Sequence, residues 1–148
     1  MLKNIKYSII NYEKIFFNIF SFISSCTQVF IPYYDFDTIM TYVHDTITYS
    51  KVNGEEWQTP EETLELGTGD CEDFVILMLK IVNDTYDIKG DLIIFKNIKT
   101  GILHAVAGLD NMYYDVTNNA IFDEYPSSYE YYDTFSYDKT MFYVKYLI

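Results

Sequence analysis

Apolar side chains recur at helical spacing soon after residue 35. They occupy positions i, i+3, i+4, i+7 and i+11, namely Phe36, Ile39, Met40, Val43 and Ile47. This spacing puts them on one face of a helix, for which Asp37 is the N-cap candidate, and Asn53-Gly54 is expected to end the unit. His44 lies beside the apolar stripe, where a structural role is expected in preference to a ligand role.

A capping box marks the start of a second, short helix. The segment TPEE, residues 59–62, offers Thr59 as N-cap, Pro60 at the first helical position and Glu62 three residues after the cap. This helix is expected to run to about Leu66.

The next helix is predicted to be the central one. Gly67 and Gly69 are expected to let the chain leave the preceding helix, and the next helix is expected to begin at Asp70. Its apolar positions cover a wide face, which is typical of a mostly buried helix. They are Phe74, Val75, Leu77, Met78, Ile81 and Val82.

After residue 90 the apolar pattern becomes that of strands. Residues 91–95, 102–108 and 112–116 are predicted strands, and residues 141–148 are a predicted fourth. Asp110-Asn111 supplies a two-residue turn between the second and third strands. Residues 123–137, rich in Tyr and acidic side chains, are expected to form a surface loop with aromatic anchors. Helices followed by antiparallel strands predict an α+β domain, over residues 35–148.

The first 26 residues show a different pattern. Three lysines precede the apolar run at 15–23, as in a secretory signal that is too short to cross a bilayer. ISSC, residues 23–26, resembles the lipobox of bacterial lipoproteins, in which Cys26 would carry the lipid and tether the chain to the membrane of the cell envelope. Glu13 and Asn18 fit an N-terminal amphipathic helix packed on the domain instead. Both interpretations stay open, and with them an envelope or a cytoplasmic location.

Composition narrows the classes of partner. The chain has 22 Asp and Glu against 10 Lys and no Arg, which gives a net charge of -12. Such a surface repels a phosphate backbone, and the guanidinium groups that read bases are missing, so nucleic acid is not expected as a partner. The acidity suits cations, calcium among them, and basic protein segments, and it equally serves solubility.

Cys71 has the position of a nucleophile. It is expected in the first turn of the central helix, where unpaired N–H groups and the helix dipole favour a thiolate and can hold an oxyanion. Asp70 and Glu72 oppose this, because neighbouring carboxylates raise the pKa of a thiol. Use of Asp70 as N-cap, a nearby imidazolium or a bound calcium would offset them. The alternative is a buried, inert thiol.

His104 and Asp115 are the candidates for base and orienting group. A turn at Asp110-Asn111 makes them diagonal neighbours on one face of a hairpin, within reach of each other. In this register Gly108 pairs with Tyr113, Val106 with Asp115, and His104 with Thr117. The carboxylate would orient the imidazole and stabilise its charged form. A strand histidine bonded to backbone is the alternative for His104 alone, but the three residues together favour catalysis.

These residues also carry a family resemblance. WQTPEETLELGTGDCEDFVILMLKIV, residues 57–82, closely resembles the signature of the bacterial transglutaminase-like cysteine protease family, in which W-x-T-P-x-E-x-L precedes G-D-C-E-D-[FY]. HAVAGLDNMYYDVTNN, residues 104–119, resembles its second and third blocks. The match covers about residues 36–119. Residues after Asn119 align with nothing in the family, and Gly90 stands later than the glycine expected after the nucleophile helix.

The resemblance implies a papain-like α+β fold, with N-terminal helices packed on a small antiparallel sheet, and a triad of Cys71, His104 and Asp115. It implies acyl transfer on a protein or peptide amide through a thioester that water resolves, with no cofactor required for the chemistry. In calcium-dependent members acidic residues flanking the nucleophile bind the metal, and Asp70 and Glu72 hold those positions, two of the six to eight oxygen ligands needed.

Some assignments stay open within the resemblance. Trp57 or Gln58 is assigned to the oxyanion or substrate side, without a choice between them. A transglutaminase would use a lysine amine in place of water. An inactive binding module on the same scaffold and a structural surface lipoprotein are the alternatives outside acyl transfer.

Overall fold

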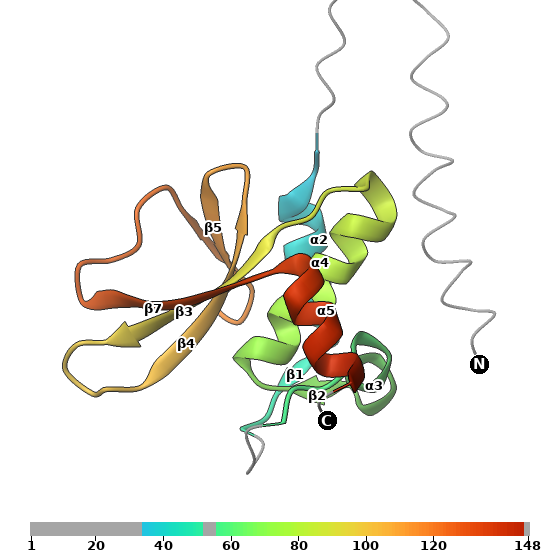
Figure 1. The fold of residues 1–148 in the computed structure, drawn as a ribbon, viewed down its shortest axis with the longest axis horizontal. Helices are drawn as coiled ribbons and strands as arrows, with labels where there is room; N and C mark the ends of the chain where they lie inside the picture. The colour runs from blue at the N-terminus through green and yellow to red at the C-terminus, as the bar shows by residue number, and fades with distance from the viewer. Residues whose placement is uncertain (1–33, 52–55, 147–148) are drawn as a thin grey trace, which may run out of the picture. The chain divides into compact units, whose positions relative to one another are not determined.

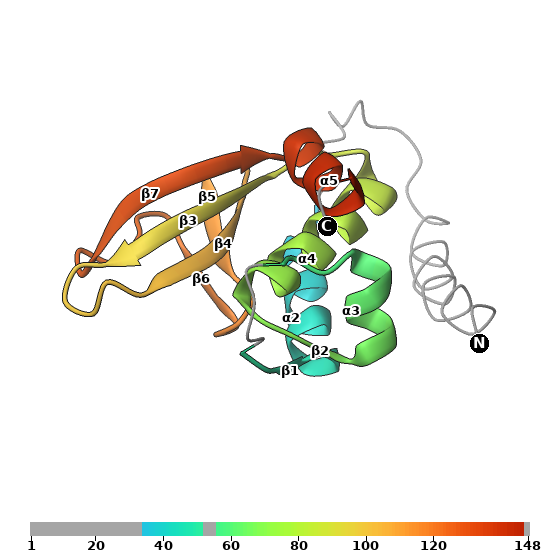
Figure 2. The ribbon, with the colours of Figure 1, turned by 60° about the horizontal axis from the view of Figure 1, so that its bottom comes forward.

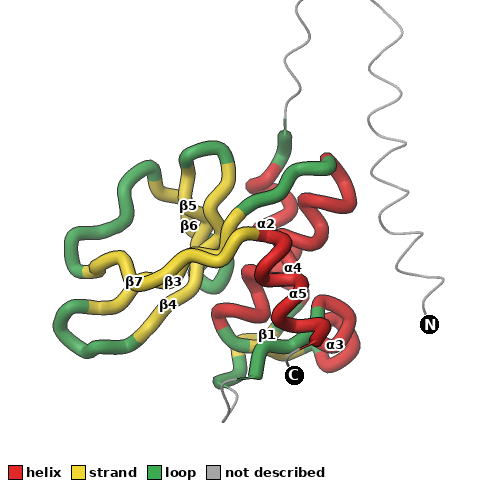
Figure 3. The backbone as a smooth tube through the Cα atoms, viewed as in Figure 1, coloured by secondary structure: helices red, strands yellow, loops and turns green. Residues whose placement is uncertain are grey.

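The structure is a computed structural model that describes residues 34–51 and 56–146. The signal or helix predicted for residues 1–26, with Cys26, and the stop predicted at Asn53-Gly54 lie outside these ranges. Helices gather on one side of a five-stranded antiparallel sheet (Figure 3). The predicted α+β fold is therefore confirmed. Among the described helices, every one is too short or too polar to span a bilayer.

Helix α2 (Phe36–Thr46) buries the predicted stripe, but its cap differs from the prediction. The N-cap is Asp35, whose Oδ1 accepts the N–H of Thr38 at 2.9 Å. Asp37 is the wrong candidate because it already lies in the first helical turn. Its negative charge there stabilises the helix by interacting with the positive end of the helix dipole. His44 has the structural role expected of it, since its Nδ1 lies 3.2 Å from the carbonyl oxygen of Val116.

Helix α3 (Pro60–Leu66) begins with the predicted capping box. Thr59 Oγ1 accepts the N–H of Glu62 at 3.2 Å, and the Glu62 carboxylate accepts the N–H of Thr59 at 2.8 Å. Gly67 ends the helix with a φ of 67°, a left-handed conformation that glycine adopts without steric cost. A short parallel bridge between β1 (Thr48–Tyr49) and β2 (Thr68–Gly69), absent from the sequence prediction, follows.

Helix α4 (Cys71–Tyr86) is the central, buried helix that the sequence predicts. Helices α2 and α3, the sheet and the C-terminal helix α5 (Tyr137–Tyr146) all contact it (Figure 1). Its fully buried side chains form the middle of the hydrophobic core. They are Phe74, Val75, Ile76, Leu77, Met78, Leu79 and Val82.

The sheet has the order β6-β5-β4-β3-β7. Strands β3 (Asp91–Asn97), β4 (Leu103–Leu109) and β5 (Met112–Asp115) match the three predicted strands. Asp110 and Asn111 form the predicted turn, with φ of 50° and 60°. β6 (Ala120–Phe122) and β7 (Tyr129–Ser136) complete the sheet, and Figure 2 shows β7 beside β3 along its length.

The C-terminal prediction is wrong in two places. The segment 123–137 is predicted to be a loop, but it contains the edge strand β7. The neighbouring tyrosines at 131 and 132 are both exposed, so the sequence of β7 lacks the alternation of buried and exposed positions that predicts a strand. Residues 141–148 were expected to be a strand because they are rich in aromatic and β-branched side chains. Residues 137–146 instead form α5, which buries Tyr137, Thr140 and Val144 at helical spacing.

The two faces of the sheet are packed differently. Side chains alternate along a strand, so Ala105 and Ala107 of β4 face α4, whereas His104 and Val106 point to the opposite face. On that opposite face Tyr125 stacks on Phe95, with ring centroids 4.1 Å apart and an interplanar angle of 2°. The expectation of an aromatic anchor in the segment 123–137 is thus confirmed by Tyr125.

Candidate active site

Cys71 is the first residue of α4, and its surroundings follow from how that helix is capped. The carboxylate of Asp73 accepts the N–H of Asp70 at 3.0 Å and that of Gln58 at 2.8 Å, which joins the helix start to the chain before α3. Gly69 leaves room for this arrangement, because a Cβ there would lie 2.7 Å from the Cβ of Asp73. The helix therefore fixes Cys71, which is 8% exposed, at its N-terminal end.

The predicted hairpin register brings His104 to Asp115. The ladder between β4 and β5 has Gly108 opposite Tyr113, as predicted, and extends to Ala107 opposite Tyr114. The further pairs predicted for Val106 and His104 lie beyond this ladder in the described residues, because the chain turns at 116–119. His104 Nε2 nevertheless lies 2.9 Å from Asp115 Oδ1, although the ring N–H is not aligned for a linear hydrogen bond.

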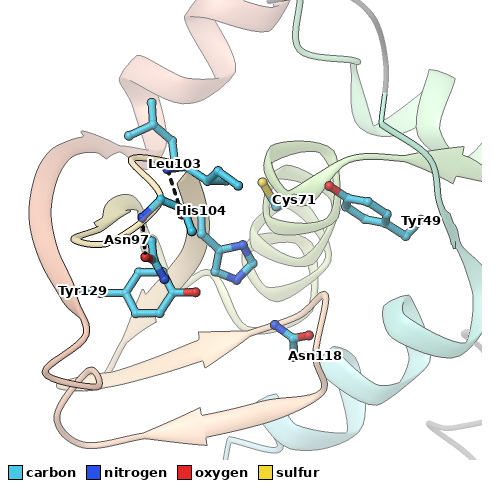
Figure 4. Close-up of a pocket in the computed structure, with 9 residues that line it drawn as sticks. Tyr49, Cys71, Asn97, Leu103, His104, Asn118 and Tyr129 are labelled. Atoms are coloured by element: carbon cyan, nitrogen blue, oxygen red, sulfur yellow. Dashed lines mark hydrogen bonds between the residues drawn. The ribbon is translucent and has the colours of Figure 1, made fainter.

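One pocket of about 300 Å³ is lined by both Cys71 and His104. Figure 4 shows the sulfur, from the start of α4, and the imidazole, from β4, on the same pocket, with Tyr49 and Asn118 also on its wall. Because Nε2 of His104 faces Asp115, Nδ1 is the ring nitrogen left to exchange a proton within the pocket. The structure thus places Cys71 and His104 on one pocket, with Asp115 against the imidazole and outside the pocket lining.

The thiol of Cys71 is held in its protonated form. Its Sγ donates to Oε2 of Glu72 at 2.9 Å. Burial and the charge of Glu72 raise the pKa of Cys71, and the N–H of Ala105, which donates to the sulfur, lowers it only in part. Burial and Glu72 also raise the pKa of Asp70, to about 6. The sequence suggested that the helix start would lower the pKa of the thiol and that the neighbouring carboxylates would raise it. In the structure the influences that raise the pKa are the stronger.

Asp115 is a buried carboxylate with several donors, 4% exposed. Burial works to raise its pKa, but the contacts with His104 and the hydrogen bonds from Asn118 outweigh burial and hold the pKa below its ordinary value. Asp115 therefore stays negatively charged next to His104, as an orienting carboxylate must.

Asp70 and Glu72, the two residues predicted as calcium ligands, lie close to each other in the structure. They interact electrostatically and through a side-chain hydrogen bond. Carboxylate oxygens are the donors that calcium prefers, and relief of the repulsion between the two would favour a divalent cation. Within the described residues, however, no three His, Cys, Asp or Glu side chains gather as a metal site would require. The oxygens of the two carboxylates are of the type that calcium binds, but two carboxylates supply fewer than the six to eight oxygen ligands that calcium takes.

Trp57 and Gln58 do not line the pocket within the described part of the chain. The ring of Trp57 packs against Phe135 and Tyr143, with centroids 5.1 and 4.9 Å away. The backbone of Gln58 binds Asp73, and its buried Oε1 lacks a partner among the described residues. The structure thus assigns Trp57 to the packing of β7 and α5.

Among the residues at the site that the sequence analysis missed are Tyr49 and Asn118. Tyr49 reaches the pocket through the β1–β2 bridge, for which two-residue strands give no sequence signal. Asn118 binds Asp115, and its place in the turn sequence VTNN was a signal that could have been used.

Comparisons with known proteins identify the family and the fold of the chain. Residues 2–139 match a family model described as a transglutaminase-like domain. Among solved structures, Legionella pneumophila LapG gives a TM-score of 0.59 at 16% identity, covering 68% of this chain and 62% of LapG. The calcium-bound form of LapG gives 0.58 at 15% identity with the same coverage. This chain thus spans less than two thirds of LapG, and the likeness concerns the fold. No curated protein sequence matches.

Proposed function

Because this chain belongs to the family of transglutaminase-like domains, we propose that it is a cysteine-dependent acyl-transfer enzyme that hydrolyses an amide bond of a protein or peptide. The observation that carries the proposal is the pocket shared by Cys71 and His104, with Asp115 2.9 Å behind the imidazole. A nucleophile, a base and an orienting group in this order are the parts needed for covalent catalysis at a carbonyl.

The chemistry follows from the protonated resting thiol. Nδ1 of His104 takes the proton of the Cys71 thiol as the sulfur attacks the carbonyl carbon, and Asp115 stabilises the imidazolium. The backbone N–H of Cys71, at the first position of α4, receives the developing oxyanion, because the N–H groups of Glu72 and Asp73 already donate to Asp70. His104 then protonates the leaving nitrogen, and the C–N bond breaks to leave a thioester on Cys71. Water, deprotonated by His104, attacks the thioester carbon, and the C–S bond breaks to release the carboxylic acid. The imidazolium then returns its proton to the sulfur of Cys71 and restores the thiol.

Calcium is the one ion to which the family likeness points, since one matching structure is calcium-bound LapG. Asp70 and Glu72 would hold it here, and its charge would neutralise the carboxylate that accepts the thiol proton. We expect added calcium to raise the unfolding temperature of the protein. The shift should vanish when Asp70→Asn and Glu72→Gln are combined, and a shift that survives both substitutions would place the ion elsewhere.

The test of the proposed reaction is cleavage of a mixed peptide library, followed by mass spectrometry, with and without calcium. Cleavage is expected for the unmodified protein, is expected to disappear in Cys71→Ala, and is expected to persist in the control Cys26→Ala. A primary amine added to the assay separates two outcomes, because incorporation of the amine instead of cleavage would identify a transglutaminase. Absence of both reactions under all conditions would favour an inactive binding module.

A further inference from the structure

Asp115 is held by hydrogen-bond donors besides its contact with His104. Oδ1, which contacts His104, also accepts the backbone N–H of Asn118 at 3.2 Å. Oδ2 accepts the side-chain amide of Asn118 at 2.9 Å and the hydroxyl of Tyr125 at 3.5 Å. A carboxylate with so many fixed donors cannot rotate without losing hydrogen bonds. Its orientation toward His104 is therefore set by these two neighbours.

Tyr125 is itself fixed by aromatic packing. Its ring stacks on Phe95 and meets the rings of Phe122 and Tyr129 at centroid distances of 5.6 and 5.2 Å. Phe95 is the cross-strand partner of His104. The segment between β6 and β7 thus brings a hydroxyl to Asp115 by stacking on the strand next to the one that carries His104.

We propose that Asn118 and Tyr125 are positioning residues, which lock the carboxylate of Asp115 so that Oδ1 stays against Nε2 of His104. This inference rests on the proposed function. A locked carboxylate favours the neutral imidazole tautomer that carries its proton on Nε2 and leaves Nδ1 free to accept the thiol proton. With the donors removed, the carboxylate can turn away, and the fraction of imidazole in this tautomer falls.

A purely structural role is the competing explanation for Asn118. Its N–H bond to Asp115 closes the turn between β5 and β6, and the following Asn119 has a φ of 51°. Asp forms such turns as readily as Asn. Asn118→Asp therefore keeps the turn but replaces the amide donor by a second negative charge. A structural role predicts that this variant behaves like the wild type, whereas a positioning role predicts that it is at least as impaired as Asn118→Ala.

The test is the ¹⁵N NMR spectrum of the histidine rings in the full chain, combined with the rate at which an activated ester acylates Cys71. The chain has two histidines, so His44 serves as the internal reference. Tyr113→Phe is the matched control, because the Tyr113 ring lies in the same cluster, 6.0 Å from Tyr125, while its hydroxyl is not among the groups that contact Asp115 in the described residues. Unfolding midpoints show that each variant is folded.

The expected result is a shift of the His104 signals away from the Nε2–H tautomer in Asn118→Ala, Asn118→Asp and Tyr125→Phe, with His44 unchanged. Acylation should slow about tenfold in Asn118→Ala, as expected for one hydrogen bond to a charged group. Unchanged His104 signals in all three variants would overturn the inference. If the signals respond as expected but Cys71 is not acylated even in the wild type, the positioning role stands and the proposed function fails.

Discussion

Replacement of Glu72 by glutamine is expected to make the thiol of Cys71 more reactive. The Glu72 carboxylate accepts the thiol proton at 2.9 Å, and its charge is the second cause, after burial, of the raised pKa of Cys71. Glutamine has nearly the same shape and no charge, so the substitution removes the repulsion between a thiolate and residue 72 while leaving the burial of the sulfur in place.

The size of the effect follows from the geometry. Two unit charges about 4 Å apart interact by roughly 4 kcal/mol at an effective dielectric constant of about 20. Glu72 is partly exposed to solvent, so we take half of this, roughly 2 kcal/mol. That is about 1.5 pKa units, or about 30-fold in the thiolate fraction at neutral pH. A thiolate of lower pKa is less nucleophilic, which leaves a net gain of about sixfold in rate.

The assay is alkylation by iodoacetamide at pH 7, with the modified peptide identified by mass spectrometry so that Cys71 is separated from Cys26. Glu61→Gln is the control, because it removes the same charge from an exposed position in α3. We expect Glu72→Gln to be alkylated faster and Glu61→Gln to match the wild type. A rate for Glu72→Gln equal to or below that of the wild type would refute the account of the thiol.

Three further predictions concern stability, measured by urea denaturation. Burial raises the pKa of Asp70 and Asp73 from 3.8 to about 6. The two carboxyl groups therefore bind protons more tightly in the folded state than in the unfolded state. As a result, the free energy of unfolding should rise by about 1 kcal/mol as pH falls from 7.5 to 5. Asp70→Asn should reduce this gain, and an equal gain in the variant would contradict the assignment. Gly90→Ala should cost roughly 2 kcal/mol, because its Cβ would lie 2.4 Å from a side-chain carbon of Leu109. Gly101→Ala, with 3.9 Å to the nearest atom, should cost only about 1 kcal/mol for its left-handed φ, so equal losses would argue against the clash. Thr59→Ala should cost about 1 kcal/mol, and an unchanged midpoint would show that the capping box adds nothing.

Local signals in the sequence were sufficient for much of the fold and site. The capping box at Thr59 and the Asp110-Asn111 turn act over a few residues, and a two-residue turn fixes the register of the hairpin around it. That register was enough to predict that His104 and Asp115 meet. The family resemblance drawn from the same residues is confirmed by the family match.

Other features depend on packing that the sequence does not reveal. The α5 helix and the β7 strand are decided by contacts with distant elements, and their exposed aromatic side chains concealed the period of each. The protonation of Cys71 depends on how deeply the sulfur is buried and on which side of it Glu72 lies, two quantities set by the fold. Trp57 lies close to the nucleophile motif in sequence, yet its ring packs on Phe135.

The central claim is that Cys71 forms an acyl intermediate with the help of His104. Its most direct test is the mass of the intact protein, quenched in acid after brief reaction with the p-nitrophenyl ester of an acylated amino acid, followed by peptide mapping. The account predicts one adduct, on Cys71, that hydroxylamine removes and that forms about 100-fold more slowly in His104→Ala. An adduct on another residue, or one that forms at the same rate without the imidazole, would contradict it.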